Sequence, residues 1–470
     1  MPYKQLKQTE TEAQQFFSLI YCSGSSWDDL ISEWRHYSHT VSHLVYDFDT
    51  IIDRLPTSSS KWSYAKKNTG YDDVLPMWVA DMDFASAPEI VAAIKERAAH
   101  PIYGYTTRTD AYYNGLINWM AKRNAWKGIK RDWILSSPGV VPGFNYCVQA
   151  YSHPGDKVII QPPVYYPFRN AILNNGRQVV DNPLKIVDGN YQMDYEDLEK
   201  KIDARTKMVI FCSPHNPVGR VWKRDELKHF AEVCERKDIL IISDEIHSDL
   251  ILGKTRHTCT ATLSDDALMR TVTLTAPNKT FNIAGLQNAD AIIPNEKLRD
   301  AFRNVTTNNS VSNPNIFGVI AQEAAYAKGE PWLEELLTYL KANLAYFEDY
   351  IKRRIPGLKV YPLEGTYLAW VDCSCLGMDD KTLHTWMLEK AKLWLDDGVM
   401  FGAEGSMFMR FNIACPRAML KDGLERLEKA AKQLPKKEVE TIKARGTPRT
   451  PIPPGCADLM SRLFLNQKPI

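Results

Sequence analysis

Three polar residues that could share one reactive site each follow a short apolar run. The residues are Asn216, Asp244 and Lys279, and the runs before them are Met208–Cys212, Ile239–Ile242 and Thr271–Leu274. A lysine amine that is fixed and partly desolvated has a lowered pKa and can form a Schiff base with a carbonyl cofactor. A carboxylate can keep a pyridine nitrogen protonated, and an amide can donate to a phenolic oxygen. This order of residues after successive strands is the layout expected of a pyridoxal 5'-phosphate (PLP) site.

Each candidate also has an ordinary structural explanation. Asp244 could cap a helix, most lysines are solvated, and Asn216 stands before Pro217, where asparagine commonly forms turns. His247 could support the same phenolic oxygen as Asn216 or could be a packed core histidine. The presence of all three polar residues in order favours the site.

Two further segments could hold parts of a cofactor. Residues 137–143, Ser-Pro-Gly-Val-Val-Pro-Gly, precede a helical pattern, and backbone N–H groups at a helix start bind phosphate. Gly139 and Val140 are therefore candidate phosphate ligands, although such loops are common. Tyr165 follows the run Val158–Gln161, where its ring could stack on a cofactor or pack in the core.

Arg410 is the candidate for binding a substrate. It lies in the apolar stretch Phe408–Ile413, where a guanidinium is costly without an anion. A bidentate contact with a substrate α-carboxylate would satisfy it, and so would an internal salt bridge.

The pattern along the chain predicts an α/β protein with two domains. Between about residues 130 and 295 apolar runs alternate with helical patterns, which indicates a mainly parallel sheet flanked by helices, with ligands at the carboxyl ends of the strands. After residue 330 a long amphipathic helix, two strand pairs (358–372 and 399–414) and helices near 380–395 and 416–433 indicate a smaller α+β domain. We expect an N-terminal extension, a small domain, a large PLP-binding domain and a C-terminal tail, at 1–45, 46–95 with 325–434, 96–324 and 435–470.

The composition narrows the function classes. The chain has 470 residues and a net charge of +1, so charge gives no case for binding nucleic acid or a membrane surface. No apolar run approaches the roughly 18 residues of a membrane span. Nine dispersed cysteines fit no common zinc spacing and suggest reduced thiols. We expect a cytoplasmic protein without a metal site.

The motifs together resemble a known family. The segments Ser213–Arg220, Ser243–Leu250, Lys279–Leu286 and Arg410–Pro416 are similar to fold-type I PLP enzymes of the aminotransferase class I/II superfamily. The segments Pro76–Phe84, Gly104–Thr106, Pro163–Phe168 and Glu364–Leu368 resemble, more narrowly, the cystathionine β-lyase/cystalysin-like carbon–sulfur lyases. The resemblance covers roughly residues 46–433, and the order and spacing of these short motifs make it specific.

The resemblance implies a role for each position that matches the family pattern. Lys279 becomes the Schiff-base lysine and Asp244 the partner of the pyridinium nitrogen. Asn216 becomes the ligand of the phenolic oxygen, Tyr165 the stacking ring and Arg410 the carboxylate anchor. The backbone near Gly139 and Val140 would hold the phosphate, and Tyr105 would reach it from the neighbouring subunit of a homodimer.

Two positions depart from the family pattern. Asn278 stands where similar lyases have serine, which we expect to alter the phosphate contacts. Gln287 stands where many aminotransferases have arginine. The carbon–sulfur lyases commonly lack that arginine as well, so its absence favours a β-lyase that cleaves cysteine thioethers to a thiol, pyruvate and ammonia. An aminotransferase and an inactive PLP-binding regulator or scaffold remain the alternatives.

Overall fold

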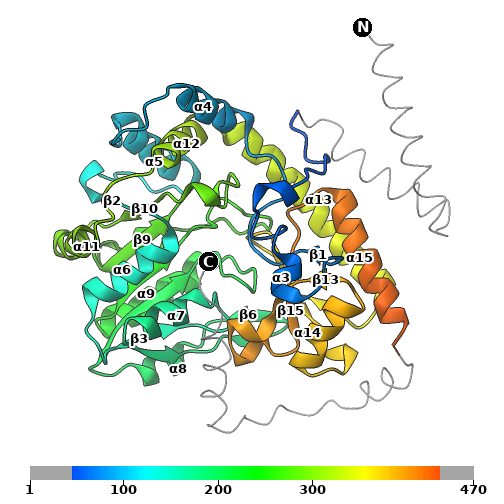
Figure 1. Ribbon diagram of the computed structural model, residues 1–470. Helices are drawn as coiled ribbons and strands as arrows, with labels where there is room; N and C mark the ends of the chain where they lie inside the picture. The colour runs from blue at the N-terminus through cyan, green and yellow to red at the C-terminus, as the bar shows by residue number, and fades with distance from the viewer. Residues whose placement is uncertain (1–44, 435–470) are drawn as a thin grey trace.

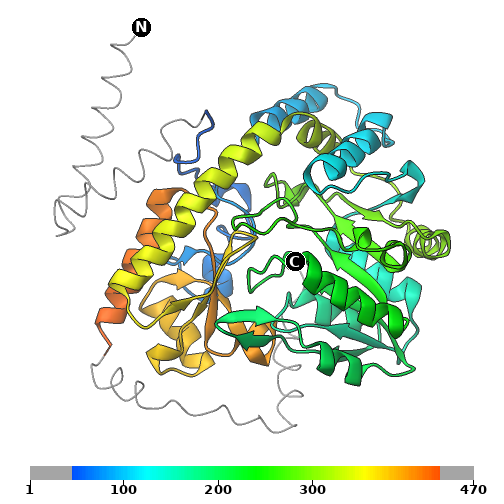
Figure 2. The ribbon, with the colours of Figure 1, turned by 180° about the vertical axis from the view of Figure 1, so that it is seen from behind.

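The computed structural model describes residues 45–434. Figure 1 and Figure 2 show a large sheet on one side of the molecule and a smaller sheet on the other, with the long helix α13 (Glu330–Arg354) running along one edge. The predicted segments 1–45 and 435–470 lie outside the described residues, apart from Val45. None of the helices in residues 45–434 combines the length and the apolar character that crossing a bilayer requires.

The large sheet has seven strands in the order β2-β10-β9-β8-β7-β3-β4. Six strands run in one direction, and β10 runs antiparallel to both of its neighbours. The strands are β2 (Ile134–Ser137), β3 (Lys157–Ile160), β4 (Gln178–Asp181), β7 (Thr206–Cys212), β8 (Leu240–Asp244), β9 (Thr271–Thr275) and β10 (Ala289–Ile292). The predicted mainly parallel sheet is confirmed.

Helices cover both faces of this sheet, which explains why its strands are almost wholly apolar. In β7, Met208 and Ile210 pack into one core, together with residues of α6 (Val140–Tyr151) and α7 (Pro167–Asn174). Val209 and Phe211 point the other way and pack against α8 (Tyr195–Lys201) and α9 (Arg224–Arg236). Alternate side chains of one strand therefore serve two separate cores.

A four-stranded antiparallel sheet forms the smaller unit, in the order β11-β12-β15-β14. Its strands are β11 (Lys359–Val360), β12 (Leu368–Asp372), β14 (Asp396–Asp397) and β15 (Phe408–Asn412). Helix α13 packs beside α15 (Arg417–Lys432) in this unit (Figure 1). The segment β1 (Leu75–Pro76) pairs in parallel with β13 (Leu393–Trp394), so a part of the chain far upstream joins the same unit.

The remaining elements are short or lie at the periphery. The helices are α3 (Ala65–Thr69), α4 (Pro88–Ala99), α5 (Asp110–Arg123), α10 (Asp265–Arg270), α11 (Glu296–Asn308), α12 (Ile316–Lys328) and α14 (Asp380–Glu389). A hairpin joins β5 (Lys185–Val187) to β6 (Asn190–Gln192). Single 3-10 turns are η1 (Leu55–Thr57), η2 (Arg131–Trp133), η3 (Thr260–Thr262), η4 (Ala284–Leu286), η5 (Ser374–Leu376), η6 (Gly398–Phe401) and η7 (Ala403–Gly405).

Two expectations for the C-terminal region are wrong in detail. The helix expected near 380–395 ends at Glu389, and Leu393–Trp394 form a strand instead. The strand pair expected over 399–414 contains only one strand, Phe408–Asn412, preceded by 3-10 turns. Two-residue strands such as β13 carry too few residues to show an alternating pattern in the sequence.

Candidate active site

Asn216, Asp244 and Lys279 follow three neighbouring strands of the large sheet. Strands β7, β8 and β9 are adjacent and parallel, with Cys212 opposite Asp244 and Asp244 opposite Leu274. All three strands therefore end at one edge, where parallel strands of an α/β sheet present their ligands. The predicted grouping of these three residues is what this topology produces.

Asp244 is a buried carboxylate, with 4% of its surface exposed. Its Oδ1 accepts a hydrogen bond from the Ile246 N–H at 3.2 Å. Burial raises the pKa of Asp244 from 3.8 to about 7, and the Ile246 N–H and the charge of Lys279 oppose that rise. A buried carboxylate in this state is stabilised by a positively charged partner, such as a protonated ring nitrogen.

Glu245 follows Asp244 in the sequence, and its buried carboxylate binds three neighbouring groups at this end of β8. Its two oxygens contact the Ser243 hydroxyl, the Thr260 N–H and the His257 Nε2, at 2.8, 3.0 and 2.9 Å. Cys259 completes a group of three possible metal ligands with Glu245 and His257, which the sequence spacing did not suggest. Because the carboxylate oxygens already have partners, hydrogen bonding alone accounts for this group.

The amine of Lys279 contacts a loop from an earlier part of the chain. Its Nζ donates to the carbonyl oxygen of Ala80 at 2.6 Å. Burial lowers the pKa of Lys279 from 10.5 to about 8, and the carboxylates of Asp81 and Asp244 oppose that change. With this pKa roughly a tenth of the amine is neutral at pH 7, far more than for an ordinary lysine, and a nucleophile or a base requires the neutral form.

Arg410 comes from β15 of the small sheet and reaches the edge of the large one. Its Nη1 donates to the Asn216 Oδ1 at 2.9 Å, and its Nη2 donates to the Trp78 carbonyl at 3.0 Å. Nη2 also forms an ion pair with Asp396, whose pKa burial raises to about 6. The internal salt bridge that the sequence left open is therefore present, while the guanidinium Nε is buried without a partner among the described residues.

The phosphate candidates stand where the sequence predicted a helix start. Helix α6 begins at Val140, with Gly139 as its N-cap residue, so backbone N–H groups of its first turn lack partners in the helix. Tyr165 follows β3 and is half-buried, with its ring 5.9 Å from that of Phe168. Because β2 and β3 are parallel to β9 in the same sheet, both segments lie at the same edge as Lys279.

Comparison with known proteins identifies the family. The sequence model of the family "Aminotransferase class I and II" matches residues 72–427. The chain is 44% identical to cystathionine beta-lyase PatB of Bacillus subtilis (strain 168) over 385 residues, which is 82% of this chain and 99% of PatB. The chain belongs to the aminotransferase class I and II family.

Solved structures share this fold over more than four-fifths of the chain. Cystalysin from Treponema denticola, which contains PLP, has a TM-score of 0.80 at 38% identity, over 83% of this chain and 99% of cystalysin. A second similar structure is a PLP-bound protein of Clostridium difficile 630 that is described as a putative aminotransferase. Its TM-score is 0.81 at 46% identity, over 82% of this chain and 100% of that protein. The fold is thus PLP fold type I, as the resemblance implied.

The side chains of this aminotransferase-family site fit PLP. Three polar atoms on residues of the site are buried without partners among the described residues: His247 Nδ1, Asn278 Oδ1 and Arg410 Nε. Burial lowers the pKa of His247, so its imidazole is neutral. The Asn278 amide could turn its NH₂ towards a phosphate by rotation, because its oxygen and nitrogen occupy equivalent positions. PLP with a bound amino acid would offer partners to these atoms, because it carries a phosphate, a phenolic oxygen and the carboxylate of the amino acid.

The structure does not bring Tyr105 into this group. Its side chain is fully exposed within the chain, whereas the other candidates are buried or half-buried. Contacts within one subunit therefore give Tyr105 no role.

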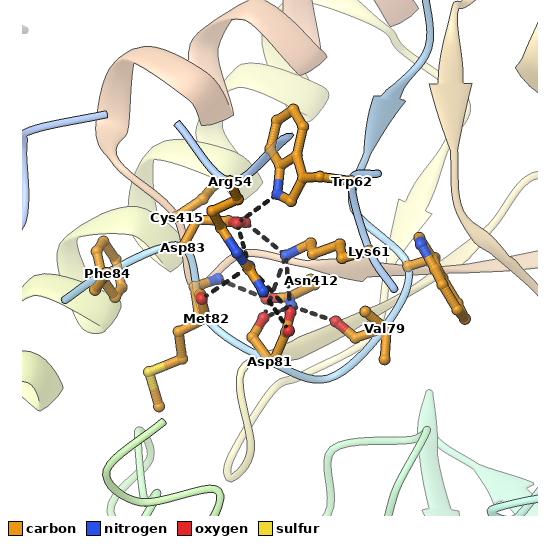
Figure 3. Close-up of polar contacts among 12 residues, drawn as sticks. Arg54, Lys61, Trp62, Val79, Asp81, Met82, Asp83, Phe84, Asn412 and Cys415 are labelled. Atoms are coloured by element: carbon orange, nitrogen blue, oxygen red, sulfur yellow. Dashed lines mark hydrogen bonds and ion pairs between the residues drawn. The ribbon is translucent and has the colours of Figure 1, made fainter. Parts of the chain in front are cut away.

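Sequence reasoning missed the second half of the site. The Ala80 carbonyl, the Tyr367 hydroxyl and the Asn282 amide hold Lys279 and the segment opposite it. The sequence signals were the segments Pro76–Phe84, Lys279–Leu286 and Glu364–Leu368, which the family resemblance singled out without a role for Ala80, Asn282 or Tyr367. Figure 3 shows the first of these segments inside a dense group of polar contacts.

Proposed function

We propose that this chain is a PLP-dependent carbon–sulfur β-lyase, which cleaves a cysteine thioether to a thiol, pyruvate and ammonia. One observation carries the proposal. Asn216, Asp244 and Lys279 stand at the ends of three adjacent parallel strands, and Arg410 is hydrogen-bonded to Asn216 at 2.9 Å. The names of the relatives PatB and cystalysin point to the same class of substrate chemistry.

The position of Gln287 favours a lyase over an aminotransferase. Many aminotransferases of the family have an arginine eight residues after the lysine, and here Gln287 ends the turn η4 with a φ of 48°. The carbon–sulfur lyases commonly lack that arginine. The aminotransferase alternative shares every other residue of the site, so the reaction itself must decide between them.

PLP, when bound, supplies the electron sink that accepts the electron pair of the broken Cα–H bond. We assign the Asp244 carboxylate to the ring nitrogen and the Asn216 and His247 side chains to the phenolic oxygen. The first turn of α6, at Gly139 and Val140, and the Asn278 amide are assigned to the phosphate. Tyr165 provides a ring beside the cofactor.

Lys279 performs two tasks in this proposal. It would hold the cofactor covalently, and its amine, when free, would remove the α-proton of the substrate. Its pKa of about 8 suits a base near neutral pH. Arg410 orients the substrate through its α-carboxylate, and a thiolate leaves the β-carbon with little acid assistance because thiols have a pKa of about 8.5.

We also propose that the protein works as a homodimer in the cytoplasm. The fully exposed ring of Tyr105 would reach the PLP phosphate of the neighbouring subunit, which accounts for its isolation within one chain. The cysteines of residues 45–434 form no disulfide, as expected in a reducing compartment. The domain limits remain those expected from the sequence, with 46–95 and 325–434 forming the small domain and 96–324 the large one.

One assay tests the proposed reaction. Purified protein is incubated with L-cystathionine or an S-alkyl cysteine, without any 2-oxo acid, and pyruvate and thiol are measured. We expect equal amounts of both products. Product that forms only with an added amino acceptor would establish the aminotransferase alternative. Cofactor absorbance near ~420 nm without any turnover would favour the regulator or scaffold.

A further inference from the structure

The loop of residues 78–83, called the 78–83 loop below, provides the hydrogen-bond acceptor of the Lys279 amine within residues 45–434. The Ala80 carbonyl accepts from Lys279 Nζ at 2.6 Å and from the Tyr367 hydroxyl at 2.9 Å. The loop has no regular secondary structure. Apart from two backbone hydrogen bonds, made by the N–H groups of Asp81 and Asp83, its shape depends on side chains that bind its backbone.

Two asparagines hold the loop from the side of the site. Asn412, two residues after Arg410, donates to the carbonyls of Val79 and Asp81 at 2.8 and 2.6 Å. Asn282, three residues after Lys279, accepts from the Met82 N–H at 2.9 Å and donates to the Met82 carbonyl at 3.0 Å. The loop is thereby tied to the segments that carry the proposed base and the proposed anchor.

Two cations from an earlier part of the chain, Arg54 and Lys61, also bind the loop (Figure 3). Lys61 pairs with Asp83 at 2.5 Å, and these side chains are only 1% and 3% exposed. Lys61 Nζ also donates to the Asp81 carbonyl at 3.2 Å. Arg54 binds the carboxylates of Asp81 and Asp83 at 2.6 and 2.7 Å.

The charges around Asp81 and Asp83 balance one another. Two cations meet two carboxylates, so the group is neutral as a whole, and the Trp62 indole adds a donor to Asp83 at 2.8 Å. Asp83 itself is fixed through its backbone N–H, which donates to the Ala414 carbonyl at 2.9 Å. A buried pair of this kind keeps its geometry because neither charge can move into water.

We infer that Lys61 is a positioning residue for Lys279: through Asp83 it fixes the 78–83 loop, so that the Ala80 carbonyl orients the Lys279 amine whenever that amine is not bonded to the cofactor. The inference rests on the proposed role of Lys279. A neutral amine has two N–H bonds and one lone pair. Donation of one N–H to a fixed carbonyl restricts the direction of the lone pair, and proton transfer depends on that direction.

The principal test is Lys61→Met in the full chain loaded with PLP. Lys66→Met is the matched control, because Lys66 lies in the same segment and its pair with Asp72 is exposed, at 74% and 71%. We measure kcat, KM and the primary isotope effect with α-deuterated substrate. For Lys61→Met we expect kcat to fall about tenfold and the isotope effect to increase, with KM within about twofold. Lys66→Met should match the parent protein.

A second readout does not depend on turnover. After removal of PLP, the rate at which added PLP restores absorbance near ~420 nm reports on the reactivity of the Lys279 amine. We expect this rate to fall about three- to tenfold in Lys61→Met and to stay unchanged in Lys66→Met. The two proposals can fail separately. If the unaltered protein takes up PLP but releases no thiol from the substrate, the proposed function is refuted. The rate of PLP uptake in Lys61→Met then still tests the inference.

Two further variants distinguish a loss of positioning from a loss of folding in Lys61→Met. Trp62→Phe removes a single N–H donor to Asp83 and should shift kcat and the isotope effect in the same direction, by about two- to threefold. Lys61→Arg keeps the charge and should restore most of kcat. Parent-like kcat, isotope effect and PLP uptake in folded Lys61→Met or Trp62→Phe would overturn the inference, and so would a rise in KM alone.

Discussion

The Lys279 amine lies between two regions that are built in different ways. On one side, the edge of the large sheet presents Asn216, Asp244 and Lys279 from three strands joined by backbone hydrogen bonds. On the other side, the 78–83 loop has no backbone ladder and is held by side chains from distant parts of the chain. Groups that carry the chemistry thus stand on a rigid sheet, and groups that orient them depend on individual polar contacts.

The largest expected effect is on the sheet side. Lys279→Ala removes both the covalent link to the cofactor and the proposed base, so we expect kcat for β-elimination to fall by about 10³-fold or more. Absorbance near ~420 nm should also disappear. Steady-state kinetics and a visible spectrum measure both. If kcat of Lys279→Ala falls no further than kcat of Lys61→Met, the sheet edge and the 78–83 loop do not differ in their role in catalysis.

The next effect concerns stability and pH. Asp244 has a pKa of 3.8 in its ordinary state and about 7 in the folded, cofactor-free protein. Between these values the folded state keeps a proton that the unfolded state has lost, so the contribution of Asp244 makes the protein less stable as pH rises and levels off above about 7. From about pH 5 to pH 8 this contribution amounts to at most about 3 kcal/mol.

The variant Asp244→Asn removes that contribution, because an amide does not titrate. It also removes the charge that raises the pKa of Lys279, and this lowers that pKa and changes the pH dependence in the same direction. Denaturant unfolding of cofactor-free protein at the two pH values should show a smaller loss of stability in the variant than in the parent. Asp396 and Asp290, whose pKa values burial raises to about 6, titrate in both proteins and cancel in the difference. If the stability of the variant and of the parent depends on pH in the same way, the pKa of Asp244 is not raised by folding.

A smaller effect is expected where the two regions meet, at Arg410. Lysine keeps the charge and can pair with Asp396, but it loses the planar set of donors that reaches both Asn216 and a substrate carboxylate. For Arg410→Lys we expect KM to rise about ten- to thirtyfold, with a smaller change in kcat. Arg426→Lys on the surface of α15 is the control. A fall in kcat with unchanged KM would assign Arg410 to orientation of Asn216 instead.

The sheet edge could be predicted from the sequence because each of its residues lies at the end of its own strand or within four residues of it. Asp244 ends β8, and Lys279 lies four residues after β9. The apolar runs identified the strands, and parallel neighbours bring their ends together without further information. Family resemblance then supplied the cofactor and the fold, which the comparisons confirmed.

The loop side could not be predicted in the same way. The acceptor for Lys279 is a backbone carbonyl 199 residues away, and a carbonyl is present whatever the residue type. Arg410 showed only that a buried guanidinium needs an anion. Its partner Asp396 lies in the two-residue strand β14, which is too short to leave a pattern. Tyr105 stays a prediction, because a single chain does not test a contact between subunits.

Arg54 and Lys61 lie ahead of residue 72, where the match to the family begins. A gene trimmed to that match would still encode Asn216, Asp244, Lys279 and Arg410. It would omit both cations that neutralise Asp81 and Asp83, leaving two carboxylates, one of them buried, without their partners beside the reactive amine. We therefore expect a chain that begins after Lys61 to lose activity, and libraries for directed evolution of this protein should include the segment that carries Arg54 and Lys61.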